Sequence, residues 1–172
     1  MVTIEKDECR QKDVVRLSVT EKMRRGHPVR LTNYTDYSLR VLIYLSSKKD
    51  QELSNIKEIA DTYQISKNHL MKVIYELGKL GYIETVRGRG GGVRLARSPE
   101  DINIGEIVRK MEEDFYLVEC FDAGKNACVI SPACQLKRIL NEALEAYFQV
   151  LDRYTLADLT RNHDQLAALL GH

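Results

Sequence analysis

The most constraining feature of the sequence is a helical pattern followed at once by two short strand candidates around a glycine-rich loop. The helical pattern lies in QISKNHLMKVIYELGKLGY, where apolar residues recur at intervals of three and four, as on a helix with one buried face. Those residues are Leu70, Val73, Ile74, Leu77 and Leu80. Ser66 is a candidate N-cap of this helix, and Gly81 is a candidate C-terminal cap.

A shorter helix is expected over residues 54–63, with Ser54 as its candidate cap. Two short helices joined by a tight turn, the second with a polar outer face, predict a helix-turn-helix. The strand candidates YIETV and VRLA enclose RGRGGG, which predicts a β-hairpin with a basic tip, the wing of a winged helix. Taken alone, RGRGGG would be an ordinary solvated turn, and it lacks the GK[ST] of a phosphate-binding loop. Its place after the helix-turn-helix favours the wing.

Further helices are expected on both sides of this unit. The first spans residues 31–48 and is capped by Thr32 or Asn33, and another begins at about Asn103. Residues 136–151 form a long amphipathic helix, whose apolar stripe is either ordinary core or a dimer interface. A short helix capped by Thr155 leads to a frayed end. The fold class is therefore mainly α, a winged helix-turn-helix domain plus a cysteine loop and a long dimerisation helix.

The charge distribution favours a nucleic-acid module in the first half. Residues 29–98 carry 12 Lys/Arg against 7 Asp/Glu, whereas residues 99–172 carry 7 against 13. A basic segment joined to an acidic one suggests a DNA-binding domain followed by a part that does not touch DNA. The candidate contacts to double-stranded DNA come from the second helix and the wing, and each is equally open to a base, phosphate or solvent role. They are Ser66, Lys67, Asn68, His69, Lys72, Arg87 and Arg89.

The chain has no apolar run long enough to span a bilayer and no secretory signal, so no membrane partner and a cytoplasmic location are expected. That compartment is reducing, and lasting disulfides are uncommon there. No general base or nucleophile pair accompanies the cysteines, which argues against an enzyme.

Three of the four cysteines lie in VECFDAGKNACVISPACQL, namely Cys120, Cys128 and Cys134. Zinc knuckles usually place paired ligands two to four residues apart and supply four of them, and neither condition holds here. Iron–sulfur clusters accept looser loops and a non-cysteine ligand. The spacing favours an iron–sulfur cluster, with zinc or a redox thiol switch as the alternatives. Cys9 stands apart and is expected to be a free thiol without a role.

Four segments resemble the nitric-oxide-sensing repressors of the IscR-like family, most closely those of Gram-positive bacilli. They are VRLTNYTDYSLRVLIYL, ISKNHLMKVIYELGKLGYIETVRGRGGGVRL, INIGEIVRKMEEDF and VECFDAGKNACVISPACQL, and the match runs from Val29 to about Arg161. The resemblance implies a homodimeric repressor with a 4Fe–4S cluster in each subunit, a 2Fe–2S cluster being the alternative. It further implies that nitrosylation releases the repressor from operators of nitric oxide detoxification and anaerobic respiration genes.

The resemblance also implies the ligands. Cys120, Cys128 and Cys134 match the cluster cysteines, and Asp36 matches an aspartate that the other subunit supplies. Relatives that regulate iron–sulfur homeostasis use a histidine in the cysteine region, where this chain has none. Such a homeostasis regulator, or a cluster-free thiol regulator of the same fold, remains the alternative function.

The chain is expected to divide into a 1–28 extension, a 29–98 DNA-binding domain, a 99–161 cluster-binding and dimerisation region and a 162–172 tail. The extension shows no period, so we expect it to lack a fixed fold. One hypothesis makes Val29 a GTG start codon preceded by a ribosome-binding sequence that encodes RRG.

Overall fold

The computed structural model of the protein describes residues 30–48 and 52–171. The expectations for residues 1–28, including Cys9, therefore lie outside the described residues. Leu31–His172 form a single unit by their mutual contacts. Within the described residues, no helix is both long and apolar enough to cross a membrane.

Helix α1 (Asn33–Ser46) is the central helix of the winged-helix part. Thr32 caps it, as expected, because its side chain accepts a hydrogen bond from the Thr35 amide at 3.3 Å. Val41 and Leu42 are fully buried and belong to one core with residues of α2, α3, the wing and α4. Because of this shared core, α2, α3, the wing and α4 all pack on α1.

Helix α2 (Ile56–Tyr63) begins two residues later than the expected 54, and its cap lies one residue after Ser54, so the prediction of Ser54 as its cap is wrong. Asn55 caps it instead, accepting from the Lys57 amide at 2.8 Å, while Glu58 accepts from the Asn55 amide at 3.3 Å. Ser54 is held elsewhere: it forms an isolated β-bridge with Val93 of the wing. A long-range pairing therefore displaces the local capping preference of serine.

Helix α3 (Lys67–Lys79) follows a turn in which Gln64 has φ +53°. Ser66 occupies the N-cap position, but its side chain makes no capping hydrogen bond to the described helix, and only its carbonyl receives the Leu70 amide. Gly81 ends the helix with φ +75°, the left-handed conformation expected of a C-terminal glycine. The helix-turn-helix predicted from the sequence is therefore present.

The wing consists of strands β1 (Ile83–Val86) and β2 (Gly92–Leu95), which pair antiparallel with Val86 opposite Gly92. The Val93 amide and carbonyl each bond Ser54 at 2.9 Å, so the hairpin is fastened to the segment before α2. Gly92 permits this approach, since a Cβ there would lie 2.6 Å from the Ser54 carbonyl oxygen.

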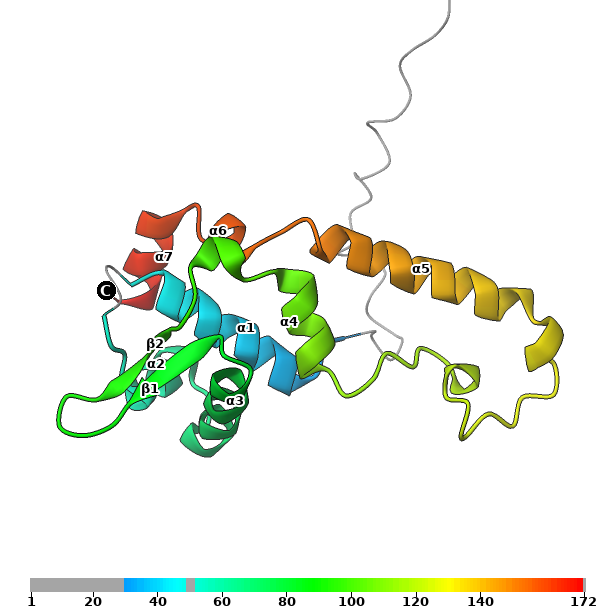
Figure 1. Cartoon of the computed structure of the whole chain (residues 1–172), viewed down its shortest axis with the longest axis horizontal. Helices are drawn as coiled ribbons and strands as arrows, with labels where there is room; N and C mark the ends of the chain where they lie inside the picture. The colour runs from blue at the N-terminus through cyan, green and yellow to red at the C-terminus, as the bar shows by residue number, and fades with distance from the viewer. Residues whose placement is uncertain (1–29, 49–51, 172) are drawn as a thin grey trace, which may run out of the picture. The chain divides into compact units, whose positions relative to one another are not determined.

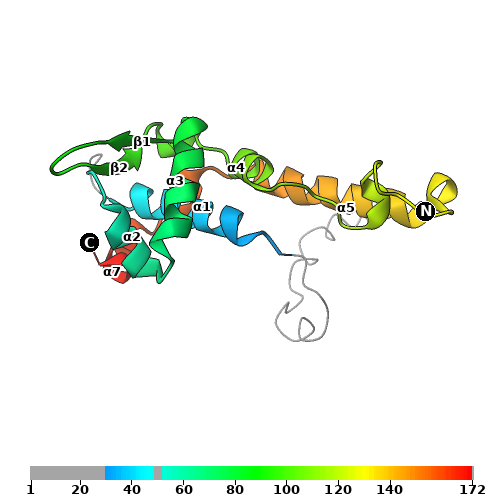
Figure 2. The same ribbon diagram turned by 90° about the horizontal axis from the view of Figure 1, so that it is seen from below.

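Helix α4 (Ile104–Met111) begins at about the expected position, directly after its cap Asn103, and leads into the cysteine loop and α5 (Gln135–Leu151). After α5, the chain returns to α1 through α6 (Leu156–Leu159), which Thr155 caps in a capping box with Asp158. The last element, α7 (His163–Leu170), is a helix, so the prediction of a frayed end is wrong. Figures 1 and 2 show α5 and the loop reaching out beyond α4.

Candidate DNA interface and cysteine loop

The exposed face of α3 carries the polar residues expected from the sequence. Lys67, Asn68, His69 and Lys72 are all exposed. The residues of the helix that face the core are Leu70, Val73, Ile74 and Leu77. In both ribbon views α3 lies beside the wing, and its end packs against β1 (Figures 1 and 2). The helix and hairpin therefore form one continuous surface.

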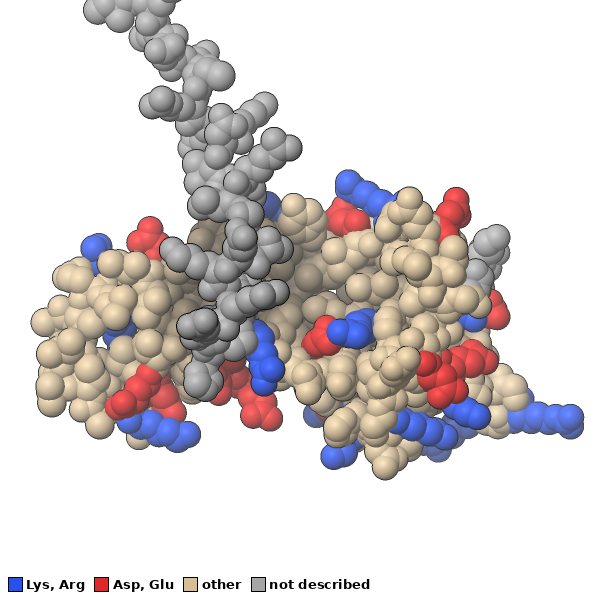
Figure 3. All heavy atoms as spheres, turned by 180° about the vertical axis from the view of Figure 1, so that it is seen from behind, with Lys and Arg blue, Asp and Glu red and all other residues tan. Residues whose placement is uncertain are grey.

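The tip of the wing carries unpaired charge. Arg87 and Arg89 are exposed, and neither has an ion pair within the described residues. Arg94 differs, because it pairs with Glu84 directly opposite on β1. Figure 3 shows Lys and Arg side chains projecting at the lower right, where the wing lies. Arg87 and Arg89 are thus the wing cations available to an anionic partner.

Two apolar residues on the same face of α3 were not among the DNA contacts expected from the sequence, all of which are polar side chains. Met71 is 50% exposed and Tyr75 is 72% exposed, so neither belongs to the core. Both residues fall between the buried positions of the 3.6-residue period, which is the signal that could have identified them.

The cysteine loop is ordered by hydrogen bonds from its own side chains to its backbone. Glu119 accepts from the Ala127 amide at 2.6 Å, and Asn126 accepts from the Cys128 amide at 3.1 Å. Asn126 also donates to the Ser131 hydroxyl at 3.1 Å. These short-range bonds shape the loop without a hydrophobic core of its own.

The three cysteines of this loop are free thiols. Cys120 is buried in a short 3-10 helix, Cys128 is half-buried, and Cys134 directly precedes α5. A cavity of about 880 Å³ opens between the loop and α5, and Cys134 and Phe121 are among its lining residues. In the described part of this single chain, no three His, Cys, Asp or Glu residues gather as a metal site. The loop thus offers soft ligands that one chain does not bring together.

Asp36 lies in the first turn of α1. Its carboxylate is 2.8 Å from the Arg40 guanidinium, and the side chain is 42% exposed. Arg40 also lies 5.8 Å from the centre of the Tyr63 ring on α2. Burial raises the pKa of Tyr63 to about 12, although the nearby Arg40 charge opposes the rise. Asp36 therefore has a cationic partner within its own chain.

The start of α1 is hydrogen-bonded to the end of α4, directly before the cysteine loop. The Thr32 amide donates to Glu112 Oε1 at 2.7 Å, and Glu112 is the last residue before the loop. On the other side, the Tyr34 hydroxyl donates to the Lys72 carbonyl of α3 at 3.2 Å. The first turn of α1 thus connects the loop to the helix that carries the candidate DNA contacts.

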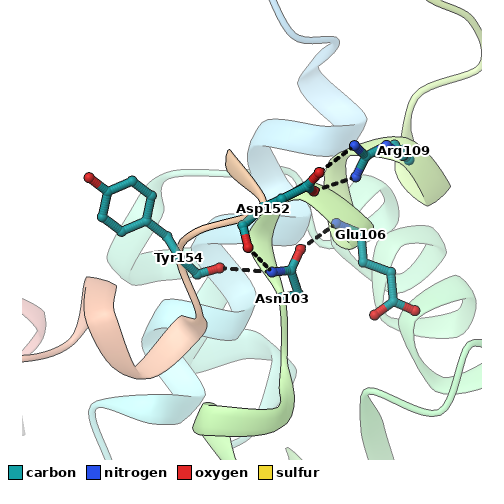
Figure 4. Close-up of polar contacts among 5 residues, drawn as sticks. All are labelled: Asn103, Glu106, Arg109, Asp152 and Tyr154. Atoms are coloured by element: carbon teal, nitrogen blue, oxygen red, sulfur yellow. Dashed lines mark hydrogen bonds and ion pairs between the residues drawn. The ribbon is translucent and has the colours of Figure 1, made fainter. Parts of the chain in front are cut away.

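The far end of α5 is fastened to α4 by a polar cluster (Figure 4). Asn103 accepts from the Glu106 amide at 3.0 Å and donates to the carbonyls of Asp152 and Tyr154 at 2.8 and 3.3 Å. Arg109 donates to both carboxylate oxygens of Asp152, at 2.5 and 2.8 Å. This two-point contact lowers the pKa of the Asp152 carboxyl and raises that of Arg109.

Close approach at this joint depends on Gly105, because a Cβ there would lie 2.0 Å from Asp152 Oδ1. Arg109 adds a cation–π contact, with its guanidinium 4.2 Å from the centre of the Phe148 ring. Helix α5 is only partly covered by the rest of the chain: some of its 17 residues, all of which are described, are half-buried, but none is buried. Its exposed apolar residues are Leu136, Ile139, Tyr147 and Val150.

Residues 31–162 match the Rrf2 family, which is described as iron-dependent transcriptional regulators. The chain belongs to the Rrf2 family. The HTH-type transcriptional regulator NsrR of Bacillus subtilis is 69% identical to this Rrf2 member over 142 residues, covering 83% of the chain and 97% of the relative.

Solved structures of regulators agree with this Rrf2 fold. T. potens IscR has a TM-score of 0.63 at 25% identity, covering 78% of this chain and 88% of the other. The oxidized form of Staphylococcus aureus CymR has a TM-score of 0.60 at 27% identity, covering 76% and 94%. The mainly α winged helix-turn-helix fold predicted from the sequence is thus confirmed, as is the resemblance to the NsrR regulators.

Proposed function

We propose that this Rrf2 protein is a homodimeric DNA-binding repressor that senses nitric oxide through a 4Fe–4S cluster. Loss of the cluster would release operators of nitric oxide detoxification and anaerobic respiration genes. The observation that carries the proposal is the loop of three free thiols, which follows Glu112, the acceptor of a hydrogen bond from the Thr32 amide at the N-cap of α1. The 69% identity to an NsrR regulator supports the same assignment.

The donor set fits such a cluster. Free thiols provide the soft ligands that iron–sulfur clusters require, and the residues that would hold the cluster are Cys120, Cys128, Cys134 and Asp36. A bound cluster would supply iron that reacts with nitric oxide. Since the described part of one chain does not gather three of these ligands, a complete site needs a rearranged loop and Asp36 of the partner subunit.

The uncovered face of α5 supports a homodimer. A helix that buries none of its residues in its own chain gains little from folding unless another surface covers it. Two-fold pairing of α5 would cover its apolar stripe and bring two copies of α3 to one operator, as helix-turn-helix repressors require.

The chain's own contacts provide a route from the site to the DNA-binding surface. Asp36 must leave Arg40 in order to bind iron, and Arg40 also lies over Tyr63 of α2. Two residues before Asp36, Tyr34 is bonded to the backbone of α3. If Asp36 exchanged Arg40 for iron, the contacts of Arg40 with α2 and of Tyr34 with α3 would carry the change to both helices of the helix-turn-helix, as a two-state element requires.

On DNA, the exposed face of α3 enters the major groove and the wing lies over the minor groove. Asn68 pairs with an adenine edge, Lys67 and Lys72 meet phosphates or guanine, and Arg87 and Arg89 reach the minor groove. Ser66 and His69, both exposed, contact the neighbouring backbone.

Anaerobic purification tests the cluster. The wild-type protein and the Cys9→Ser control should be coloured, contain iron and sulfide, and lose both colour and operator binding when nitric oxide is added. Ser substitution of any of the three loop cysteines should abolish all these properties. A colourless wild-type protein without iron would overturn the cluster assignment.

Asp36→Ala tests the fourth ligand. We expect the variant to retain less iron after reconstitution and to lose a graded response to nitric oxide. The matched control is Asp61→Ala, which removes an exposed carboxylate from α2 and should behave as wild type. Equal iron retention by both variants would remove Asp36 from the ligand set.

Arg89→Ala tests the wing contact. Removing one phosphate contact should reduce the slope of log affinity against log salt concentration by about 1. Arg153→Ala is the control, because it removes an exposed cation beyond α5. An unchanged slope in Arg89→Ala would exclude this wing contact.

A cluster-free thiol regulator is the second candidate. The fold likeness to CymR, which was solved in an oxidized form, favours it. In that case operator binding would respond to thiol oxidation in protein that contains no iron. The likeness to T. potens IscR likewise keeps a regulator of iron–sulfur homeostasis open, which operators of cluster-assembly genes would identify.

A further inference from the structure

The outer face of α3 carries apolar as well as polar side chains. Residues spaced three and four apart lie on one face of a helix, and the face opposite the core consists of Asn68, Met71, Lys72, Tyr75 and Lys79. Met71 and Tyr75 therefore lie on the same helix face as the candidate DNA contacts Asn68 and Lys72.

These two residues stand out within the winged-helix part. Among the described residues from 30 to 98, the large hydrophobic side chains that remain exposed are Met71, Tyr75 and Val86. Val86 ends β1 at the base of the wing tip. All three lie on α3 or the wing, while the core buries the other large apolar groups wholly or partly. Among the described residues from 30 to 98, the exposed large apolar side chains are thus confined to the elements that would face DNA.

The continuity of this apolar surface with Asn68 and Lys72 identifies its occupant as duplex DNA. In the major groove the apolar feature of a base edge is the C5-methyl of thymine. Methionine suits such a contact because its unbranched, polarizable side chain adapts to an irregular surface. Tyrosine instead offers a ring and a hydroxyl that can donate to a phosphate.

Helix geometry places the two residues differently in the groove. Met71 lies about 4.5 Å along the helix from Asn68, close to the roughly 3.4 Å rise of one base pair. Tyr75 lies about 10 Å from Asn68, towards the end of the helix that leaves the base edges. A residue near the start of the helix reads bases, and one near its end meets the sugar–phosphate backbone.

We propose that Met71 is a specificity-determining residue that packs on a thymine methyl next to the base paired by Asn68, and that Tyr75 anchors the adjacent phosphate through its hydroxyl. The proposal rests on the DNA-binding function proposed above. It adds recognition of the DNA sequence by an apolar contact to a surface whose other proposed DNA contacts are polar.

The test is selection of binding sites from a random duplex library, made once with thymine and once with deoxyuridine, which lacks the methyl. Wild-type protein should prefer thymine at one position per half-site, and deoxyuridine there should weaken binding about fourfold, as expected for one buried methyl. Met71→Ala should bind the thymine site about fourfold more weakly and show no further loss with deoxyuridine. Met71→Leu should retain part of the preference.

Two controls separate the outcomes. Tyr75→Phe should weaken binding to all sequences alike, whereas Leu169→Ala, at an exposed apolar position on α7, should change nothing. Equal affinity of wild type for thymine and deoxyuridine sites, or a methyl effect that persists in Met71→Ala, overturns the proposal while leaving DNA binding intact. A wild-type protein that selects no sequence overturns DNA binding itself and the proposal with it.

Discussion

Gly92→Ala should destabilise the protein by detaching the wing from the segment before α2. The new Cβ would lie 2.6 Å from the Ser54 carbonyl oxygen and 3.0 Å from its carbon, and both atoms belong to the backbone. The two segments must therefore separate, which breaks both 2.9 Å hydrogen bonds between Ser54 and Val93. Each bond contributes about 1 kcal/mol, and polar groups left unpaired after the separation add up to about 1 kcal/mol in total.

The expected loss is about 2–3 kcal/mol in the free energy of unfolding. For a chain of this length, that loss lowers the thermal midpoint by roughly 4–12 °C. Gly78→Ala provides the matched control, because the new Cβ in α3 would make only an ordinary 3.9 Å contact with the Ile83 carbonyl oxygen. Alanine is the better helix former, so this variant should gain about 0.5–1 kcal/mol.

Thermal unfolding followed by circular dichroism, at one protein concentration for all variants, measures both effects. A detached wing should also lose its proposed contact with DNA. Gly92→Ala should therefore reduce the slope of log affinity for DNA against log salt concentration, as Arg89→Ala should. If Gly92→Ala unfolds at the wild-type temperature, or if the two glycine variants shift in the same direction, the inferred fastening of the wing is wrong.

Three further outcomes follow from contacts described above. Asn55→Ala should lower the free energy of unfolding by about 1 kcal/mol, measured by chemical denaturation, because it removes the cap of α2. Ser54→Ala should be nearly neutral, because the buried Ser54 hydroxyl has no hydrogen-bond partner among the described residues. Stability should fall between about pH 10 and pH 12, because unfolded Tyr63 ionises near 10 while its folded pKa is about 12; Tyr63→Phe should reduce that fall in denaturation curves measured across the range. Glu119→Ala should lower iron retention after reconstitution, since the Ala127 amide loses its acceptor; iron analysis matching wild type would exclude that role.

Much of this fold could be predicted because short-range sequence signals determine where its helices begin and end. Examples are the three-and-four spacing on α3, the start of α4 at about Asn103 and the glycine at position 81. Ser54 shows where local reasoning fails. Its partner Val93 lies far along the chain, so no pattern near residue 54 could reveal the pairing.

The candidate site was less predictable for a similar reason. The three thiols can be read directly from the sequence, but their spacing does not say how they lie relative to one another, and the described part of one chain does not gather three ligands as a metal site. The resemblance to a known family, rather than any pattern, pointed to Asp36. Its pairing with Arg40 one helical turn away is a local feature that the sequence analysis could have anticipated.

In the homodimer proposed above, the exposed apolar residues of α5 make assembly depend on the abundance of the protein. Where a second copy completes the fold, mass action sets the fraction of assembled protein, and each tenfold change in concentration shifts assembly by about 1.4 kcal/mol per dimer. Dilution would therefore deplete complete ligand sets and paired DNA-reading heads together. A cell could then adjust the threshold of its response through the number of copies it makes, without altering a single residue.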